Sequence, residues 1–311
     1  MPFNQGWQYQ EQVQPAAVGL TLLQYYCQRY HHSTRQEWQA RIEAGQVLLN
    51  GTPATADVIL QAGQELTYCR PPWQEPDVPL TFEVLYADAD VLAIAKPSGL
   101  PVLPGGGFLE HTLLRLLQKH YPQDSPVPIH RLGRGTSGVM LLARSPLARA
   151  SLSQQLRDRR ITKIYRALMG TGPLPDTFTV TQPIGKIPYP ALGYVYGTTS
   201  EGAFAQSHFR VLERRPEAIL AAVEIPTGRP HQIRIHAAVA GYPLIGDPLY
   251  VAGGVPGTTV DGVSQPVPGD CGYWLHAHTV TFHHPRTDEA IQLTCAPPEI
   301  LSTLEDTQCS R

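Results

Sequence analysis

The sequence has no long apolar run and no segment typical of a secretion signal. Apolar runs such as VMLLA, residues 139–143, are far shorter than the ~20 residues that a membrane-spanning helix needs. The first residues, MPFNQGWQYQEQ, lack the basic patch followed by an apolar stretch that marks a signal peptide. We therefore expect a cytoplasmic protein with no membrane partner.

Cysteine is scarce, and its spacing excludes the usual disulfide and zinc patterns. The five cysteines are scattered and form no CxxC pair. Histidines come in close pairs, such as His276 with His278 and His231 with His236. No cysteine or carboxylate stands near them at the spacing of a known metal site. We expect structural or RNA-facing histidines and no bound metal.

Three common nucleotide or hydrolase signatures are also absent. The stretch GRGTSG, residues 133–138, does not end in the GK[ST] of a phosphate-binding loop. It lacks the GxGxxG spacing of dinucleotide-binding folds, and no GxSxG places a serine on a nucleophile elbow. These absences leave the function of this polar, glycine-rich stretch to be decided by its wider context.

Positive charge is concentrated in one part of an acidic chain. Residues 130–166 contain nine Lys or Arg and one acidic residue, Asp158, so this segment carries +8 in a chain whose formal net charge is −2. A local basic region on an acidic protein is typical of a surface that binds an anionic partner. An ordinary solvated helix face would give the same count, so charge alone does not show that this region binds an anionic partner.

The first 74 residues have the pattern of a small separate domain. Two segments with helical spacing, residues 18–30 and 33–45, precede an extended run, and Ser33 with Gln36 suggests a capping box at the second helix. Asn50-Gly51 between extended runs predicts a tight hairpin turn. The proline-rich stretch RPPWQEP, residues 70–76, then ends the unit.

This order, with IEAGQVLLNG at the helix-to-hairpin junction, resembles the S-four-type RNA-binding domain, also called the αL motif. The resemblance covers about residues 15–72. It implies that the second helix and its following loop bind the RNA backbone, with Arg35 as a candidate contact. The same helix also carries Glu37 and Glu43, and a bare helix-hairpin unit is the alternative.

Residues 75–300 predict a larger α+β domain with a mixed or antiparallel central sheet and flanking helices, and residues 301–311 a tail. Strand-like segments surround a turn at Asp88-Ala89-Asp90, and the alternation in ITKIYRALMG puts Lys163 and Tyr165 on one face of a strand. Residues 226–250 predict a helix capped by Thr227 and ended by Gly241, with Arg234 on its polar face. A salt-bridged scaffold role for Arg234 is the alternative to ligand binding.

Taken together, four ordered motifs resemble the RluA family of RNA pseudouridine synthases: KPSGLPV (96–102), HRLGRGTSGVMLLARS (130–145), KIYRA (163–167) and TGRPHQIRIHAAVAGYPLIGDPLY (227–250). The resemblance implies that a uridine is flipped from structured RNA, rRNA or tRNA, and that its base-to-ribose bond is broken and re-formed at a ring carbon. It implies no cofactor, RNA as the partner, and a monomer. The reaction needs an aromatic wall for the flipped base and cations along the backbone.

The resemblance also assigns roles to individual residues. Tyr165 matches the active-site tyrosine that stacks on the base and takes part in proton transfer, and Arg234 matches the arginine that pairs with a catalytic aspartate. Arg131 matches the residue that fills the gap in the RNA stack. The remaining cationic or polar candidates for binding RNA or orienting the site are Arg134, Lys163, Arg229 and His231.

One position departs from the family pattern. Where the family has His-Arg-Leu-Asp-Arg, this chain has Gly133 at the aspartate position. Glycine can neither react with the sugar nor neutralise Arg234, and an uncompensated buried guanidinium is costly. We expect Arg234 either to find another anion, with Asp124 and Asp247 as candidates, or to be more exposed. Gly133 leaves two hypotheses open: a synthase with a substitute group, or an RNA-binding protein without synthase activity, such as an RNA-folding or ribosome-assembly factor.

Overall fold

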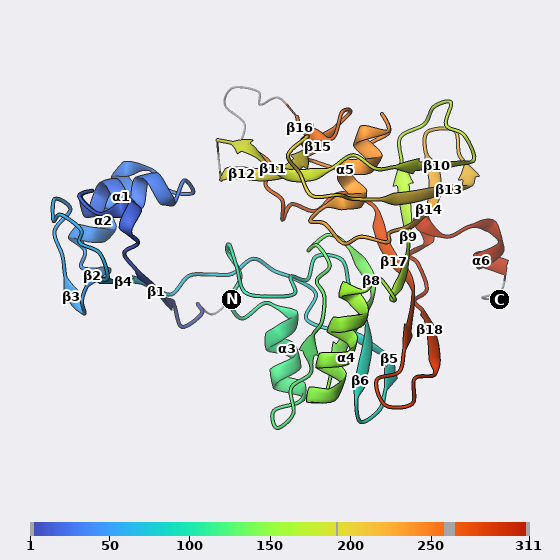
Figure 1. Ribbon diagram of the computed structural model, residues 1–311, viewed down its shortest axis with the longest axis horizontal. Coiled ribbons are helices and arrows are strands. Elements are labelled where there is room, and N and C mark those ends of the chain that lie inside the picture. Colours follow the sequence, from blue (N-terminus) through green and yellow to red (C-terminus); the bar gives the residue numbers. More distant parts are fainter. Residues whose placement is uncertain (1–2, 191, 258–264, 309–311) are drawn as a thin grey trace. The chain divides into compact units, whose positions relative to one another are not determined.

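The computed structural model describes residues 3–190, 192–257 and 265–308 (Figure 1). The chain divides into two compact units, Met1–Pro76 with Pro188–Val195, and Asp77–Ile187 with Tyr196–Arg311. The sequence predicts a single boundary after residue 74, and nothing in its local pattern indicates that a later segment groups with the first unit.

The first unit is a four-stranded antiparallel sheet with two helices packed against it (Figure 1). Its strand order is β1-β4-β2-β3. The buried Trp38 and Ile42 lie one helical turn apart and join Leu66 of the sheet in one apolar core. The elements are β1 (Trp7–Gln12), η1 (Pro15–Ala17), α1 (Leu22–Arg29), α2 (Arg35–Glu43), β2 (Val47–Leu49), β3 (Thr52–Pro53) and β4 (Glu65–Arg70).

Local sequence explains where these elements begin and end. The Thr34 hydroxyl accepts from the Glu37 backbone N–H, and the Glu37 carboxylate accepts from the Thr34 backbone N–H, so the capping box lies one residue later than the Ser33 pair that we predicted. The difference arises because Ser33 and Thr34 are both good caps. The predicted hairpin turn is confirmed, since Asn50 and Gly51 both have positive φ between β2 and β3.

The second unit is built on a ten-stranded mixed sheet, which confirms the predicted α+β class. Its main order is β10-β13-β14-β9-β17-β8-β6-β5, with β18 beside β17 and β7 beside β8. All pairs are antiparallel except β17 with β8. The strands are β5 (Glu83–Ala87), β6 (Val91–Lys96), β7 (Val127–Pro128), β8 (Ser137–Ala143), β9 (Thr162–Met169), β10 (Thr177–Val180), β13 (Ser207–Arg214), β14 (Ile219–Glu224), β17 (Leu275–His283) and β18 (Ala290–Thr294).

Helices cover this sheet, and two further strand pairs form separate two-stranded sheets. The helix α4 packs on β8 and β17, and α5 contacts β13 (Figure 1). The helices are α3 (Leu113–His120), α4 (Pro146–Arg157), α5 (Gln232–Val239), η2 (Glu299–Leu301) and α6 (Leu304–Gln308). The strand pairs are β11 (Ile184–Tyr189) with β12 (Gly193–Thr198), and β15 (Tyr250–Val251) with β16 (Val255–Pro256). No helix within the described ranges is long and apolar enough to cross a membrane.

Two sequence predictions about the second unit need correction. The helix expected from Thr227 begins only at Gln232, because the Thr227 hydroxyl bonds the Gln232 side chain at 2.8 Å instead of capping a backbone N–H. This helix has no polar outer face, since all residues from Gln232 to Ala238 are buried. After residue 300 the chain is also not a plain tail: Leu301 is buried and the Asp306 carboxylate lies 3.4 Å from Arg166.

Candidate active site

Sheet register brings the separate sequence motifs together. Lys96 of β6 pairs with Gly138 of β8, Gly138 pairs with Ala277 of β17, and Ala277 pairs with Tyr165 of β9. One row of residues across four strands therefore joins the KPSG, TSG and KIYRA motifs with a fourth segment, LHAHT (residues 275–279). Lys96 and Ala277 are 181 positions apart in the sequence, yet both pair with Gly138, because the order of strands in the sheet differs from their order in the chain.

Lys96 holds in place the glycine-rich loop, which we define as HRLGRGTSG, residues 130–138. Its side chain is 1% exposed, and its ammonium donates to the carbonyl oxygens of Pro97, Leu100 and Arg134 at 2.8, 2.8 and 3.2 Å. Burial lowers the pKa of Lys96 to about 7, while the three carbonyl oxygens stabilise its charged form. The buried lysine thus ties the loop that contains Gly133 to the loop after β6.

Arg234 has a carboxylate partner, as its burial requires. Its Nε donates to Oδ2 of Asp247 at 2.7 Å and its Nη2 donates to Oδ1 at 2.7 Å, so the pair is bidentate. Both side chains are at most 2% exposed. Asp247 Oδ1 also accepts from the backbone N–H groups of Leu249 and Tyr250. Of the two carboxylates considered from the sequence, Asp247 is the one that neutralises Arg234.

The space beside Gly133 is occupied by a tyrosine. A Cβ atom added at Gly133 would lie 2.8 Å from the Tyr273 hydroxyl oxygen, and one added at Gly135 would lie 3.0 Å from the Tyr273 ring. The ring of Tyr273 also faces the Arg234 guanidinium, whose carbon lies 4.2 Å from the ring centroid. The two glycines on either side of Arg134 therefore make room for this one side chain.

This packing makes a direct prediction about the aspartate position. We expect Gly133→Asp to lower the free energy of unfolding by about 1–3 kcal/mol, because the new Cβ forces Tyr273 from its site. Urea unfolding measures the change, and Gly105→Asp is the matched control because nothing lies within 4 Å of its added Cβ. Equal stability of Gly133→Asp and the control would contradict this packing.

Two predicted site residues carry polar groups with no protein partner in the described part of the chain. Tyr165 is 8% exposed, and burial raises its pKa to about 12, so its hydroxyl is protonated near neutral pH. Burial also lowers the pKa of Lys163, whose charge acts on His130 of the glycine-rich loop. The Lys163 Nζ lies near Gly228, 3.7 Å from where a Cβ would stand. Both groups are available to a ligand.

His231 has a defined tautomer. The Tyr250 hydroxyl donates to the Tyr196 carbonyl at 2.7 Å, so it accepts from His231 Nδ1, also at 2.7 Å. Burial lowers the pKa of His231 to about 4, which leaves the ring neutral with its lone pair on Nε2. His231 precedes α5 with φ of 55°, a left-handed conformation that a non-glycine residue adopts rarely.

The three other arginines near these motifs differ in how they are held. Arg131 is exposed and has no protein hydrogen bond in the described part of the chain. Arg134 donates to the Gly269 carbonyl at 2.7 Å and lies over the Phe108 ring, and the exposed Arg229 donates to the Phe204 carbonyl at 2.9 Å. Arg131 is therefore the one of these three whose guanidinium is not used inside the protein.

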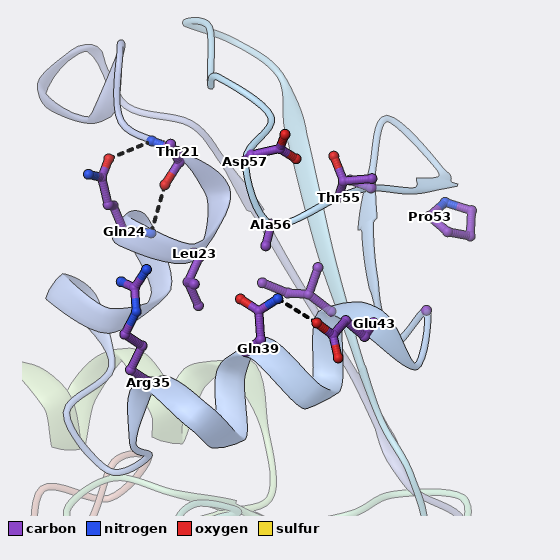
Figure 2. Close-up of a pocket in the computed structure, with 13 residues that line it drawn as sticks. Thr21, Leu23, Gln24, Arg35, Gln39, Glu43, Pro53, Thr55, Ala56 and Asp57 are labelled. Carbon is purple, nitrogen blue, oxygen red and sulfur yellow. Dashed lines mark hydrogen bonds between the residues drawn. The ribbon is translucent and has the colours of Figure 1, made fainter.

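Arg35 lies in the first unit at a separate hollow. It is exposed at the first turn of α2 and lines a cavity of about 730 Å³, which Figure 2 shows between α2 and the segment from Pro53 to Asp57. Gln39 donates a hydrogen bond to Glu43 on the same wall. This lining has mixed charge, so Arg35 is not part of a purely basic surface.

The paired histidines make ordinary protein hydrogen bonds. His276 bonds the Ser137 hydroxyl at 2.9 Å and the Cys295 carbonyl at 3.1 Å, and His278 bonds the same carbonyl at 3.0 Å. His236 bonds Ser207 at 2.9 Å. Within the described residues no three His, Cys, Asp or Glu side chains gather in the way that a metal site requires.

Comparison with known proteins identifies the family. Residues 90–239 match the family model described as RNA pseudouridylate synthase. A Synechocystis protein named as an uncharacterized RNA pseudouridine synthase is 53% identical over 282 residues, which are 90% of this chain and 96% of the relative. The chain belongs to the RNA pseudouridine synthase family.

A plant relative and a solved human structure are also similar to this chain. RNA pseudouridine synthase 5 of Oryza sativa is 42% identical over 360 aligned residues, covering 98% of this chain and 90% of the relative. The solved structure of human RNA pseudouridylate synthase domain containing 1 has a TM-score of 0.55 at 21% identity, covering 76% of this chain and 97% of that one. That structure shows the same fold, and the names of the sequence relatives favour a synthase over a protein that only binds RNA.

Reasoning from the sequence missed two contributors to the site. Tyr273 stands two residues before the LHAHT segment and has no local signal, because the glycines that accommodate it are 138 and 140 positions away. Lys96 is the first residue of a motif that we singled out, but its burial is not visible in the sequence. A glycine at both positions beside Arg134 is the signal that could have pointed to a bulky neighbour.

Proposed function

We propose that this protein converts uridine to pseudouridine in a structured RNA, either rRNA or tRNA, without a cofactor. The observation that carries the proposal is the position of Tyr165, in register with the glycine-rich loop and with a hydroxyl that no described residue bonds. A buried aromatic ring with a free hydroxyl beside the cationic Lys163 fits a flipped base and the phosphate next to it. Membership of the family supports the same reaction.

In this proposal each side chain has a part that its surroundings allow. Tyr165 stacks on the uracil, and Lys163 and Arg131 bind the RNA, with Arg131 filling the gap that the flipped base leaves. Arg234 acts through its fixed charge, because Asp247 already takes two of its donors. His231 is neutral, so we assign it an acceptor role toward an RNA hydroxyl instead of phosphate binding.

More peripheral contacts complete the proposal. Arg134 and Arg229 line the path of the RNA backbone, and Arg35 provides a contact from the first unit. We propose that the protein acts as a monomer in the cytoplasm, as we expect from the sequence. Size-exclusion chromatography with light scattering checks the monomer, with a mass of 34.2 kDa expected.

The test is a map of pseudouridine in cellular rRNA and tRNA with and without the gene. We expect at least one modified uridine to disappear on deletion and to return with the wild-type chain but not with Tyr165→Phe. If no site changes while RNA still crosslinks to residues 130–166, the binding-only alternative replaces this proposal.

A further inference from the structure

Tyr273 places a hydroxyl where the glycine-rich loop has no side chain. Its oxygen lies 2.8 Å from the Cβ position of Gly133, and Gly133 itself is exposed to solvent. Tyr273 is 4% exposed, comparable to the 8% of Tyr165. The hydroxyl of this buried tyrosine therefore lies directly beside an exposed backbone position.

The surroundings of Tyr273 suit a phenol that gives up and regains a proton. Burial raises the pKa of Tyr273, so the hydroxyl starts protonated. Arg234 and the Thr136 hydroxyl, which lies 3.3 Å away, act to lower the same pKa. The guanidinium faces the ring at 4.2 Å and stabilises a phenolate once it forms. Asp247 and Cys271 are the other ionisable groups that act on this ring.

We propose that Tyr273 is a catalytic residue of this chain, acting as the proton carrier in place of a carboxylate at position 133. This inference rests on the proposed function. As the bond between C1′ and N1 breaks, the phenol gives its proton to the departing uracil at N1, which leaves a phenolate and an electron-deficient ribose carbon. The uracil turns, its C5 bonds to C1′, and the phenolate takes the proton from C5. The hydroxyl is regenerated, and atoms and charge balance without any co-reactant.

The packing distinguishes the role of the Tyr273 hydroxyl from the role of its ring. The ring alone fills the space beside Gly135 and covers Arg234, and a phenylalanine would do both. Without the hydroxyl, the nearest atom to a Cβ at Gly133 would be the Thr136 Oγ1 at 3.4 Å, an ordinary contact. The glycine at 133 is therefore required by the hydroxyl and not by the ring, which is why we assign the function to the hydroxyl.

A double-mutant cycle on the full-length protein tests the proposal. The substrate is total RNA from a strain that lacks the gene, and the readouts are the single-turnover rate of pseudouridine formation, the Kd for that RNA and the melting temperature. We expect Tyr273→Phe to be at least about 100-fold slower, as for loss of a proton-transfer group, with the Kd unchanged within about threefold. We expect Gly133→Ala to be slower by about tenfold because its methyl group displaces the hydroxyl. The double variant should be no slower than Tyr273→Phe.

Each outcome bears on the proposal. A Tyr273→Phe protein whose rate stays within about threefold of wild type overturns it, because the ring alone then suffices. Losses that multiply in the double variant also overturn it, since Gly133 and the hydroxyl would then act separately. Wild-type protein that forms no pseudouridine in any RNA defeats the proposed function itself, so the two failures are distinguishable.

Discussion

Asp247→Asn should lower the free energy of unfolding by about 3–5 kcal/mol, the typical effect of removing one partner from a buried ion pair. The carboxylate is 1% exposed and accepts four hydrogen bonds, two from Arg234 and two from backbone N–H groups that shape the turn after it. An amide has no charge to neutralise the guanidinium, and its NH2 group points a donor at another donor. Chemical denaturation of the two proteins measures the difference.

A matched variant tests whether burial of the ion pair is the reason for the large loss of stability that we expect for Asp247→Asn. Asp176 pairs with Arg214 at 2.7 Å, the same distance as in the buried pair, but its side chain is 86% exposed. We expect Asp176→Asn to change stability by no more than about 1 kcal/mol, since solvent screens such pairs. If Asp247→Asn is as mild as Asp176→Asn, Arg234 is not held by this carboxylate and its charge is balanced elsewhere.

Tyr165→Phe should reduce the rate of pseudouridine formation by about 100-fold, the typical cost of removing one hydrogen-bond donor from the transition state, while leaving the melting temperature unchanged. The two effects separate because no described residue hydrogen-bonds the Tyr165 hydroxyl, so removing it costs the folded protein no contact. The ring remains to stack on the base, and what is lost is a group that bonds the substrate. Because burial raises the pKa of Tyr165 to about 12, its hydroxyl remains a donor throughout the neutral range.

Tyr121→Phe is the control for this measurement. Tyr121 packs on the same core through its ring and lies beneath Arg144, outside the glycine-rich loop and outside β9. Its variant should keep both the rate and the melting temperature of the wild type. A Tyr165→Phe protein as active as Tyr121→Phe would remove Tyr165 from the chemistry and leave it a role in packing only.

The parts of the fold that could be predicted are those with local causes. Amphipathic spacing, caps and the Asn50-Gly51 turn depend on neighbouring residues, so the helices and the first hairpin followed from the pattern. The helix that contains Arg234 was placed four residues too early, with its cap at Thr227 instead of His231, because a threonine shortly before a proline also looks like a cap. The complete burial of this helix could not be predicted from the sequence, because tertiary packing determines which elements surround a helix.

The sequence by itself determined the family, the α+β class and the motifs that form the site. Tertiary structure alone decided which side chain occupies the space beside Gly133 and which carboxylate neutralises Arg234. In GRG, residues 133–135, the two glycines look like flexibility around an arginine, but they are the space for Tyr273. Asp247, which looks like part of a turn, also neutralises Arg234. The physical reason is the same in both cases: close packing and buried charge pairs join residues that are distant in the chain, and no local pattern records the distance between them.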